Sequence, residues 1–376
     1  MNNEAQLLYS APDQDADMLY LGQFQAPDAF LAIKFRGKSY AFMNSLEFGR
    51  AIKESTFDNI LSLDEWKEKL VTLKKAFNNI ELIKCFAKEF NVSTFVIPEN
   101  FPAGLAFQLK KARVKLNVKE TPFFPERMCK NDIQAEAIKA GNKLSALGFK
   151  RTRKILEKST IKKGVLYYKK KVLTSEFIKQ EIDTICLEKG ASAKGTIVAC
   201  GDQACDPHDS GTGPIYANQL IIVDIFPRVE KTGYFGDMTR TFLKGKASKE
   251  QKKLMNAVRE CQKHVLENIR PRQSCQKIHQ LAVDYFEANG FKTGRDGDGY
   301  KGFFHGTGHG LGLDIHERPN LGSRGGNDLL KTGMTVTVEP GLYYKGIGGV
   351  RIEDVVRVTP KGYERLSSSP YKWEIK

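Results

Sequence analysis

The segment 305–317, HGTGHGLGLDIHE, places three of the chain's six histidines among four glycines. His305 and His309 are four residues apart, a spacing that fits one turn of a zinc-peptidase helix. Each of the three glycines around them would destabilise a helix interior by about 1 kcal/mol relative to alanine. Position 306 is also Gly, where the helical zinc motif has Glu. We therefore expect an extended strand or turn rather than a helix.

Side chains on such a strand alternate between its two faces, so His305 and His309 share one face. His316 falls on the other face of a flat strand, and we expect a bulge or bend if all three converge. Histidines gathered where glycine keeps the backbone accessible indicate a binding or catalytic site. The alternative is a loop that holds these histidines by chance.

A chain of 376 residues is long for one core, which predicts two domains. Residues 1–125 alternate strand-like and helix-like stretches, including a hairpin around residues 36–38, and hold no clustered acids. We expect a small α/β domain there. Two prolines in residues 121–125 interrupt both periodicities and mark the boundary. Residues 126–376 form the second domain.

The second domain repeats an order of two helices followed by strands. Capping residues predict helix starts after Asn131, Thr174, Ser248 and Ser274, and Gly148 predicts an end of the first helix near Leu147. The strands are expected at residues 196–200, 219–226, 238–243, 335–339 and 350–358. We expect two similar halves whose strands form one sheet under packed helices. The fold class is α+β, because the strands cluster.

Four acids stand at the ends of these apolar strands or within them: Asp224, Asp237, Glu339 and Glu353. Carboxylates are rarely buried unless they are paired or bind a cation. Each acid alone could reach water, but four charges and one neutral imidazole balance two divalent cations. Oxygen-rich ligands with one imidazole favour Mn²⁺, Co²⁺, Fe²⁺ or Zn²⁺, and metal-assisted hydrolysis is the reaction class indicated. The spacing leaves the choice between His305 and His309 as ligand open.

The net charge of +15 is unevenly distributed, since ten of the 25 residues from Phe149 to Leu173 are Lys or Arg. This run could bind a polyanion, but without a nucleic-acid motif we expect a solvated helix end and turn. We therefore expect no nucleic-acid partner. The seven cysteines are scattered without a Cys-x-x-Cys pair, which indicates reduced thiols. With no signal sequence or long apolar run, we expect a cytoplasmic protein without a membrane partner.

Several motifs together resemble one family. Asp224, GYFGDMTRTF at 233–242, the segment 305–317, TVEPGLY at 337–343 and RIED at 351–354 occur in the order found in the pita-bread metallopeptidases. This group contains methionine aminopeptidase, aminopeptidase P and prolidase. The resemblance implies a pita-bread fold with pseudo-twofold halves over 126–376, preceded by a creatinase-like α/β domain over 1–125. The TRTF and LDIHE motifs are similar to the proline-directed branch.

The resemblance also implies a metal-ligand set. Its members are two acids that bridge the metals, Asp237 and Glu353, together with Asp224, His309 and Glu339. The implied cofactors are two divalent ions, Mn²⁺ first, with Co²⁺, Zn²⁺ and Fe²⁺ as alternatives.

Further roles follow from the same resemblance. Glu339 would also act as general base, His316 would stabilise the oxyanion, and His208 would contact the scissile amide. His305 and Arg351 would shape the pocket for proline. From the residues alone, His208 could be a surface loop histidine, and Arg351 could be a surface cation paired with Asp354.

The implied function is hydrolysis of the bond between an N-terminal residue and proline, as by an Xaa-Pro aminopeptidase. The alternatives are an Xaa-Pro dipeptidase, a peptide- or chromatin-binding module on the same fold, and a metal-free hydrolase like creatinase. The five retained ligand positions argue against the last two. The resemblance suggests a homodimer or larger assembly. One departure is that Asp224 and Asp237 are 13 residues apart, where the family has 11. An even insertion preserves strand register, so both acids can still face the metals.

Overall fold

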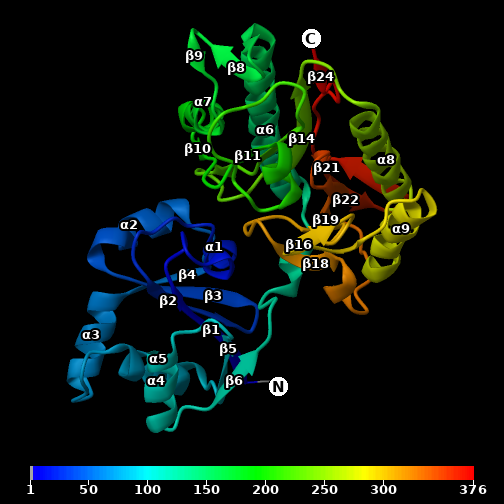
Figure 1. The fold of residues 1–376 in the computed structure, drawn as a ribbon. Helices are drawn as coiled ribbons and strands as arrows, with labels where there is room; N and C mark the ends of the chain where they lie inside the picture. Colours follow the sequence, from blue (N-terminus) through cyan, green and yellow to red (C-terminus); the bar gives the residue numbers. More distant parts are fainter. Residues whose placement is uncertain (1–2) are drawn as a thin grey trace. The chain divides into compact units, whose positions relative to one another are not determined.

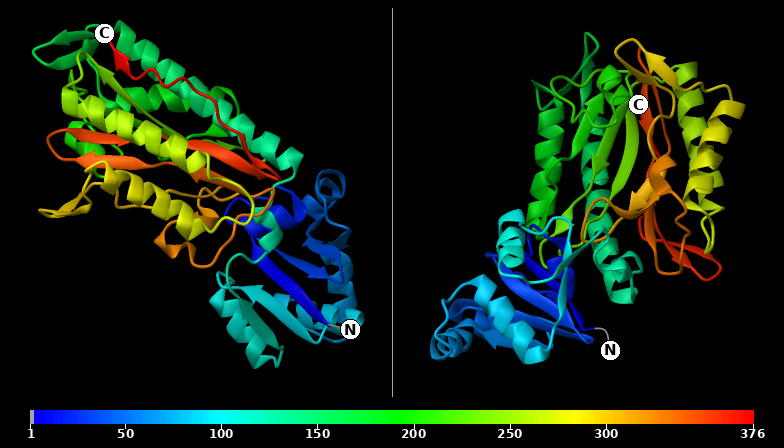
Figure 2. Two further views of the ribbon diagram at one scale, coloured as in Figure 1. Left: turned by 90° about the vertical axis from the view of Figure 1, so that its right-hand side faces the viewer. Right: turned by 90° about the horizontal axis from the view of Figure 1, so that it is seen from below.

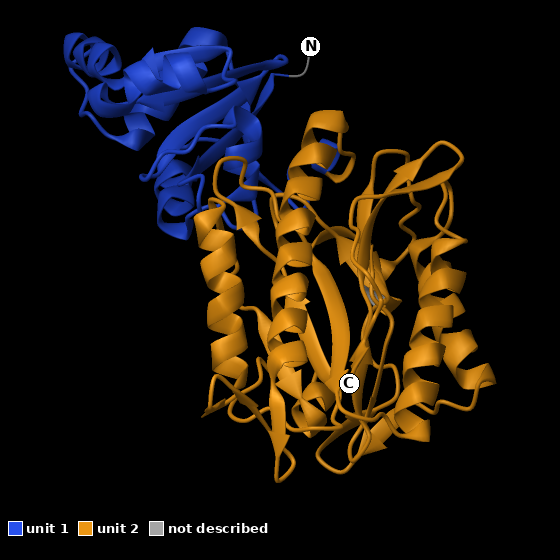
Figure 3. Ribbon diagram, turned by 90° about the horizontal axis from the view of Figure 1, so that it is seen from above, with its two compact units in different colours: residues 1–127 blue, residues 128–376 orange. Residues whose placement is uncertain are grey.

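The computed structural model describes residues 3–376 and divides the chain into two compact units, residues 1–127 and 128–376 (Figure 3). Each unit has apolar cores of its own. Among the described residues, no helix combines the length and apolar character that a membrane span requires. The short 3₁₀ helix η1 (Pro125–Met128) lies at the junction of the two units in the sequence.

Unit 1 is built on a six-stranded mixed sheet with the strand order β4-β3-β2-β1-β5-β6. The hairpin of β2 and β3 forms around residues 36 and 37 as predicted. The strands are β1 (Glu4–Ser10), β2 (Phe30–Phe35), β3 (Lys38–Met43), β4 (Asn59–Ser62), β5 (Thr94–Pro98) and β6 (Leu116–Lys119). The helices are α1 (Ala16–Gly22), α2 (Ser45–Glu54), α3 (Leu63–Thr72), α4 (Asn79–Phe90) and α5 (Ala103–Lys111).

Unit 2 consists of two halves, each with a pair of helices packed on its own sheet (Figure 1). The first half holds α6 (Asp132–Lys158), α7 (Ser175–Glu188) and the sheet of β11 (Ile197–Cys200), β12 (Ile221–Ile225), β14 (Met238–Lys244) and β24 (Glu374–Ile375). The second half holds α8 (Lys249–Leu266), α9 (Cys275–Ala288) and the sheet, in spatial order, of β18 (Glu317–Leu321), β17 (Gly308–Gly310), β19 (Thr335–Val338), β22 (Asp354–Thr359) and β23 (Gly362–Arg365).

Smaller elements complete unit 2. They are the ribbon of β7 (Thr160–Lys162), β8 (Val165–Tyr168) and β9 (Lys171–Val172), and the pairs β10 (Ala191–Ser192) with β13 (Arg228–Val229), β15 (Gly294–Asp296) with β16 (Gly299–Lys301), and β20 (Gly341–Tyr344) with β21 (Gly348–Arg351). Two 3₁₀ helices, η2 (Gly201–Cys205) and η3 (Ser323–Gly325), lie in loops. The C-terminal segment that includes β24 runs alongside α6 (Figure 2).

The four predicted helix starts are confirmed. Asn131 and Ser248 form capping boxes with the glutamines three residues later, and Thr174 and Ser274 cap α7 and α9. The predicted end of the first helix is wrong, because α6 continues through Gly148 to Lys158. A Cβ on Gly148 would lie 2.6 Å from Cδ1 of Ile225, so this glycine permits close packing on β12 rather than ending a helix.

The prediction of one continuous sheet is also wrong, because the two halves form separate sheets. Where β14 meets residues 351–353, the hydroxyl of Thr241 donates to the carbonyl of Arg351 and accepts from its N–H. A single backbone bond follows, from Glu353 N–H to the carbonyl of Thr239. A side-chain hydroxyl thus replaces regular ladder pairing at this junction, and the expected strand 350–358 is divided into β21 and β22.

Candidate metal centre

Asp224 and Asp237 lie on the same face of the first half's sheet. In the antiparallel ladder of β12 and β14, Asp224 is directly opposite Thr239, and Asp237 precedes Thr239 by two residues. Opposite residues and residues two apart share a face. The longer connection between these strands contains β13 and leaves this register intact. Both aspartates are therefore directed to the same side, and both are buried.

The segment 305–317 is not helical and matches the predicted strand or turn: residues 308–310 form β17, and bends follow at residues 312–316. The register between β17 and β18 shifts between His309 and Gly310, which is the expected bulge. After this bulge the chain turns back, which brings His316 beside His309. The two rings meet edge to face with centroids 4.4 Å apart. His305 precedes β17, and its Nε2 lies 2.8 Å from the hydroxyl of Tyr343.

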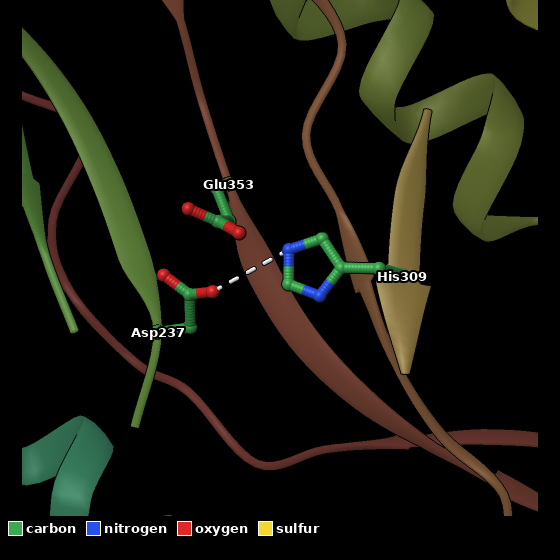
Figure 4. Close-up of side chains that lie close together, drawn as sticks. All are labelled: Asp237, His309 and Glu353. Atoms are coloured by element: carbon green, nitrogen blue, oxygen red, sulfur yellow. Dashed lines mark ion pairs between the residues drawn. The ribbon is translucent and has the colours of Figure 1, made fainter. Parts of the chain in front are cut away.

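Three side chains converge between the two halves: His309 from β17, Asp237 from just before β14, and Glu353 from the link between β21 and β22. Asp237, His309 and Glu353 each direct one ligand atom to a common point, and these atoms lie within 4.8 Å of one another (Figure 4). The Nε2 atom of His309 is 3.6 Å from Oδ2 of Asp237 and 3.3 Å from Oε1 of Glu339. A fourth acid, Asp224, is close enough for its charge to act on Asp237 and Glu353.

Burial raises the pKa of Asp237 and Glu353 well above the usual range, and the neighbouring carboxylates of Asp224 and Glu339 raise both further. Burial also raises the pKa of Asp224, although the adjacent Arg351 opposes this. These mutual effects show that the four acids lie close enough to repel one another. Without a compensating cation, their ionised forms are unfavourable.

His309 and Glu339 form a charged pair within this group. Burial disfavours the charge of His309, but its hydrogen bond to Glu339 and the charges of Glu339 and Asp237 outweigh burial and raise its pKa to about 9. Burial likewise opposes ionisation of Glu339, yet His309 lowers the pKa of this carboxyl to about 2. In the absence of metal, a protonated His309 thus supplies one of the positive charges that the acids require.

Arg351 supplies the other positive charge. Its guanidinium is buried and donates to Asp224 Oδ2 at 2.8 Å and to the hydroxyl of Tyr343 at 3.1 Å. The surface pairing of Arg351 with Asp354 is not found. Asp354 pairs instead with Arg240 at 2.8 Å in a buried contact.

The protein groups around the four acids do not satisfy their charges and oxygen atoms, whereas divalent cations would. Oδ1 of Asp224 is buried and has no hydrogen-bond partner among the residues that the structure describes. Glu353 receives one hydrogen bond from Thr239, whose hydroxyl lies 2.8 Å away. Two protein cations do not balance three buried carboxylates and the partly buried Glu339, whereas hard divalent ions are bound by such oxygen ligands.

His208 occupies an exposed loop after η2 and lies near two histidines of the site, the partly buried His305 and the exposed His316. Burial lowers the pKa of His305 to about 4 and also lowers the pKa of His316, with smaller contributions from His208 in each case. Arg351 holds this loop in place, because its guanidinium donates to the carbonyl of Pro207 at 3.3 Å. The structure thus brings all the predicted site residues to one region.

Three further residues were not singled out in the sequence. The hydroxyl of Thr337 accepts from the N–H of His309 and donates to Oε1 of Glu339, and Thr239 donates to Glu353. Tyr343 connects His305 and Arg351. Alternation offered a signal for the threonines, because each stands two residues from an acid on the same strand face.

Comparison with known proteins gives a consistent result. Residues 136–360 match the model of "Metallopeptidase family M24". An uncharacterized peptidase of Staphylococcus aureus is 34% identical over 207 residues, which cover 54% of this chain and 56% of that protein. An uncharacterized peptidase of Methanocaldococcus jannaschii is 37% identical over 204 residues, covering 53% and 55%. The chain spans about half the length of the curated relatives that it matches.

Solved structures are similar over nearly the whole chain. An Xaa-Pro dipeptidase from Bacillus anthracis superimposes with a TM-score of 0.81 at 25% identity, covering 99% of this chain and 95% of that one. An X-Pro aminopeptidase from Thermotoga maritima MSB8 gives a TM-score of 0.80 at 22% identity, covering 99% and 97%. These matches confirm the predicted pita-bread fold and the resemblance drawn from the motifs.

Proposed function

Because the chain belongs to the metallopeptidase family M24, we propose that it is a metal-dependent exopeptidase that cleaves the bond between an N-terminal residue and proline. The observation that carries this proposal is the convergence of Asp237, His309 and Glu353 between the two halves. Asp224 and Glu339 complete the ligand set of two divalent ions, with Mn²⁺ as the first candidate and Co²⁺, Zn²⁺ and Fe²⁺ as alternatives. When bound, such ions activate water and polarise a carbonyl.

Glu339 is suited to accept a proton from the attacking water. It is ionised at neutral pH, and its Oε1 is held by Thr337 and by His309. His309 must lose its proton to bind a cation, and the bound cations would then replace its positive charge beside Glu339. The general base and its neighbouring ligand are therefore coupled.

His316 and His208 are suited to donate hydrogen bonds to the substrate. The lowered pKa of His316 favours its neutral imidazole, which has one N–H available for the oxygen on which charge develops. The exposed His208 can approach the scissile amide from the loop that Arg351 anchors. Pre-placed donors of this kind stabilise a tetrahedral intermediate without reorganisation.

His305 and Arg351 are proposed to shape the proline-side pocket. The pKa of about 4 leaves His305 uncharged, and its contacts with the rings of Phe303, Phe304 and Tyr343 give it apolar surroundings. An apolar wall of this kind suits a pyrrolidine ring. Arg351 restrains that wall through Tyr343.

We favour an aminopeptidase that acts on peptides with proline at the second position, with an Xaa-Pro dipeptidase as the alternative. The solved structures that resemble this chain include proteins described by each name, so the fold supports both. No observation favours a non-catalytic binding module, since all five ligand positions hold ligand-type side chains. A homodimer or larger assembly and a cytoplasmic location remain predictions.

The deciding experiment is to strip the purified chain of metal, add back Mn²⁺ or Co²⁺, and assay Gly-Pro beside Gly-Pro-Xaa peptides. Metal-dependent cleavage of Gly-Pro-Xaa is expected. Cleavage of Gly-Pro alone would establish the dipeptidase instead. Cleavage of neither peptide, with metal bound, would refute the peptidase proposal.

A further inference from the structure

One strongly charged surface of unit 2 has no part in the proposed reaction. It comprises the C-terminal end of α6 and the β7–β9 ribbon, residues 149–173, and is termed here the lysine ribbon. These 25 residues hold ten basic residues and one acid, which is +9 of the chain's net +15. The rest of the chain, 14 times longer, carries only +6. A chain that is merely rich in lysine would carry its excess positive charge evenly along the sequence. The concentration of this charge in residues 149–173 therefore needs another explanation.

The charge of the lysine ribbon is not compensated within the protein. Its two arginines form ion pairs with Glu181 and Glu157. Glu157, the single acid, is already paired: its hydrogen bond from Arg153, with the charges of Lys372 and Lys244, lowers its pKa. The eight lysines are all exposed, and none has an ion-pair partner among residues 3–376. They are Lys150, Lys154, Lys158, Lys162, Lys163, Lys169, Lys170 and Lys171.

The placement of these lysines opposes stability. Lys150, Lys154 and Lys158 are four residues apart along α6, and like charges at this spacing destabilise a helix by about 0.2–0.5 kcal/mol per pair. Lys163, Lys169 and Lys170 adopt left-handed backbone conformations with φ of 49°, 50° and 65°, positions at which glycine or asparagine is preferred. Local stability therefore does not explain why lysine occupies these sites.

We propose that the lysine ribbon docks on an anionic lipid surface. Lysines on flexible stems act as point charges that suit a diffuse layer of lipid headgroups, whereas specific nucleic-acid recognition relies on arginine, which is already paired here. Val172, 39% exposed, lies beside the lysines on the outward face and can enter the headgroup layer. Tyr167 and Tyr168 are half-buried under Lys162 and Lys169, so they offer no open ring for stacking bases.

The geometry of the ribbon supports this partner. Leu166 of the central strand is fully buried in the core of the first half, which directs the opposite ribbon face outward. Lys162, Tyr167 and Val172 lie on that outward face, since Tyr167 pairs with Val172 and Lys162 with Val165, two residues away. The lysines of the turns flank it, and the ribbon stands beside the end of α6 (Figure 1). This inference replaces the expectation of a merely solvated helix end without a membrane partner.

The test measures binding of the full chain to vesicles of phosphatidylcholine with and without phosphatidylserine. Binding is expected only with phosphatidylserine, and it should weaken as salt is raised. Each lysine near such a surface contributes about fivefold to partitioning, so replacing Lys162, Lys163, Lys169 and Lys170 together by Gln should reduce binding more than about 100-fold. Equal binding to neutral vesicles, or no binding at low salt, would overturn the proposal.

A matched control replaces four exposed lysines of unit 1, Lys53, Lys88, Lys110 and Lys111, by Gln. This variant has the same net charge as the ribbon variant and should bind vesicles nearly as the wild type does. An equal loss in both variants would show that net charge, not the lysine ribbon, is responsible. Cleavage of proline peptides should be unchanged in both, so the test is independent of the proposed function.

A further substitution separates lipid from nucleic acid as the anionic partner. Val172→Ser should weaken binding to phosphatidylserine vesicles, because the exposed aliphatic group no longer enters the headgroup layer. Duplex RNA at the same salt is the competitor. Tighter binding to RNA than to vesicles, with no effect of Val172→Ser, would replace the lipid proposal.

Discussion

Gly141 of α6 lies against Gly236, the residue that precedes Asp237. A Cβ on Gly141 would be 2.4 Å from the backbone nitrogen of Gly236, and a Cβ on Gly236 would be 2.3 Å from the carbonyl carbon of Gly141. The helix and the start of β14 therefore approach through two residues without side chains. The N–H of Asp237 also donates to the side chain of Asn142, one residue further along the helix. Helix α6 thus positions one of the proposed bridging ligands.

We predict that Gly141→Ala destabilises unit 2 and weakens metal binding. Alanine in a helix interior is ordinarily favoured over glycine by about 0.5–1 kcal/mol. Here the new methyl group meets backbone atoms that cannot rotate away, and such overpacking costs about 1–3 kcal/mol. Thermal unfolding should shift down by a few degrees, and metal content after dialysis should fall.

Gly49→Ala is the matched control, because Gly49 lies in helix α2 with no atom within 4 Å of an added Cβ. This change should raise the stability of unit 1 slightly and leave metal content unchanged. If Gly141→Ala behaved like Gly49→Ala, the close approach of α6 to Asp237 would have no energetic importance.

We predict that Glu339→Gln retains metal but reduces kcat about 10²–10⁴-fold, the range typical for loss of a general base. The amide can still receive the hydrogen bond from Thr337, yet it cannot accept a proton. Metal analysis and kinetics on a Gly-Pro-Xaa peptide measure the two effects separately. Glu364→Gln, in a partly exposed glutamate paired with Lys139 and Arg357, is the control and should leave kcat unchanged. Near wild-type activity of Glu339→Gln would refute its role.

We predict opposite effects of Glu353→Gln and Asp354→Asn on the metal-free protein, although the residues are adjacent. The raised pKa of Glu353, caused by burial and then by Asp237, means that its charge is unfavourable without metal. Glu353→Gln should therefore stabilise the metal-free protein while weakening metal binding more than about tenfold. Asp354→Asn should destabilise it by about 3–5 kcal/mol, because Arg240 loses its buried partner.

Thermal unfolding of both metal-free variants, with metal titrations of the folded forms, checks this pair of predictions. Asp354→Asn should retain the wild-type metal stoichiometry. A loss of bound metal in Asp354→Asn, or destabilisation by Glu353→Gln, would contradict the division between a metal-facing and a structural acid.

We predict that metal binding at neutral pH releases protons. The pKa of His309 is raised to about 9 in the metal-free protein, so its imidazole is protonated below that pH and must lose the proton to bind a cation. The raised pKa values of Asp237 and Glu353 act in the same direction. Affinity should thus increase as pH rises towards about 9 and level off above it.

Calorimetric titration in two buffers of different ionisation enthalpy measures this release. The apparent heat should depend on the buffer at neutral pH, and the dependence should diminish above the pKa of His309. A heat that is independent of the buffer at neutral pH would show that His309 is already neutral before metal arrives.

The local features of this site could be predicted from the sequence. The glycines of the segment 305–317 exclude a helix, and three histidines on one extended segment require a bulge between His309 and His316. The acids at strand ends were recognisable because a carboxylate after an apolar strand is unusual. These features depend on residues close together in the chain, whose spacing sets the direction of each side chain.

Other features were decided only by the tertiary structure. Gly148 does not end α6, because its missing side chain leaves room for Ile225 to pack against the helix. The two halves do not share one sheet, because the hydroxyl of Thr241 interrupts the ladder of backbone hydrogen bonds at Arg351. Arg351 pairs with Asp224, 127 residues away, rather than with nearby Asp354. The segment 305–317 alone did not identify the ligand, whereas the strands beside it place His309 near Asp237 and Glu339, and His305 near Tyr343. Local spacing sets a side chain's direction, but the register of distant strands decides which group it meets.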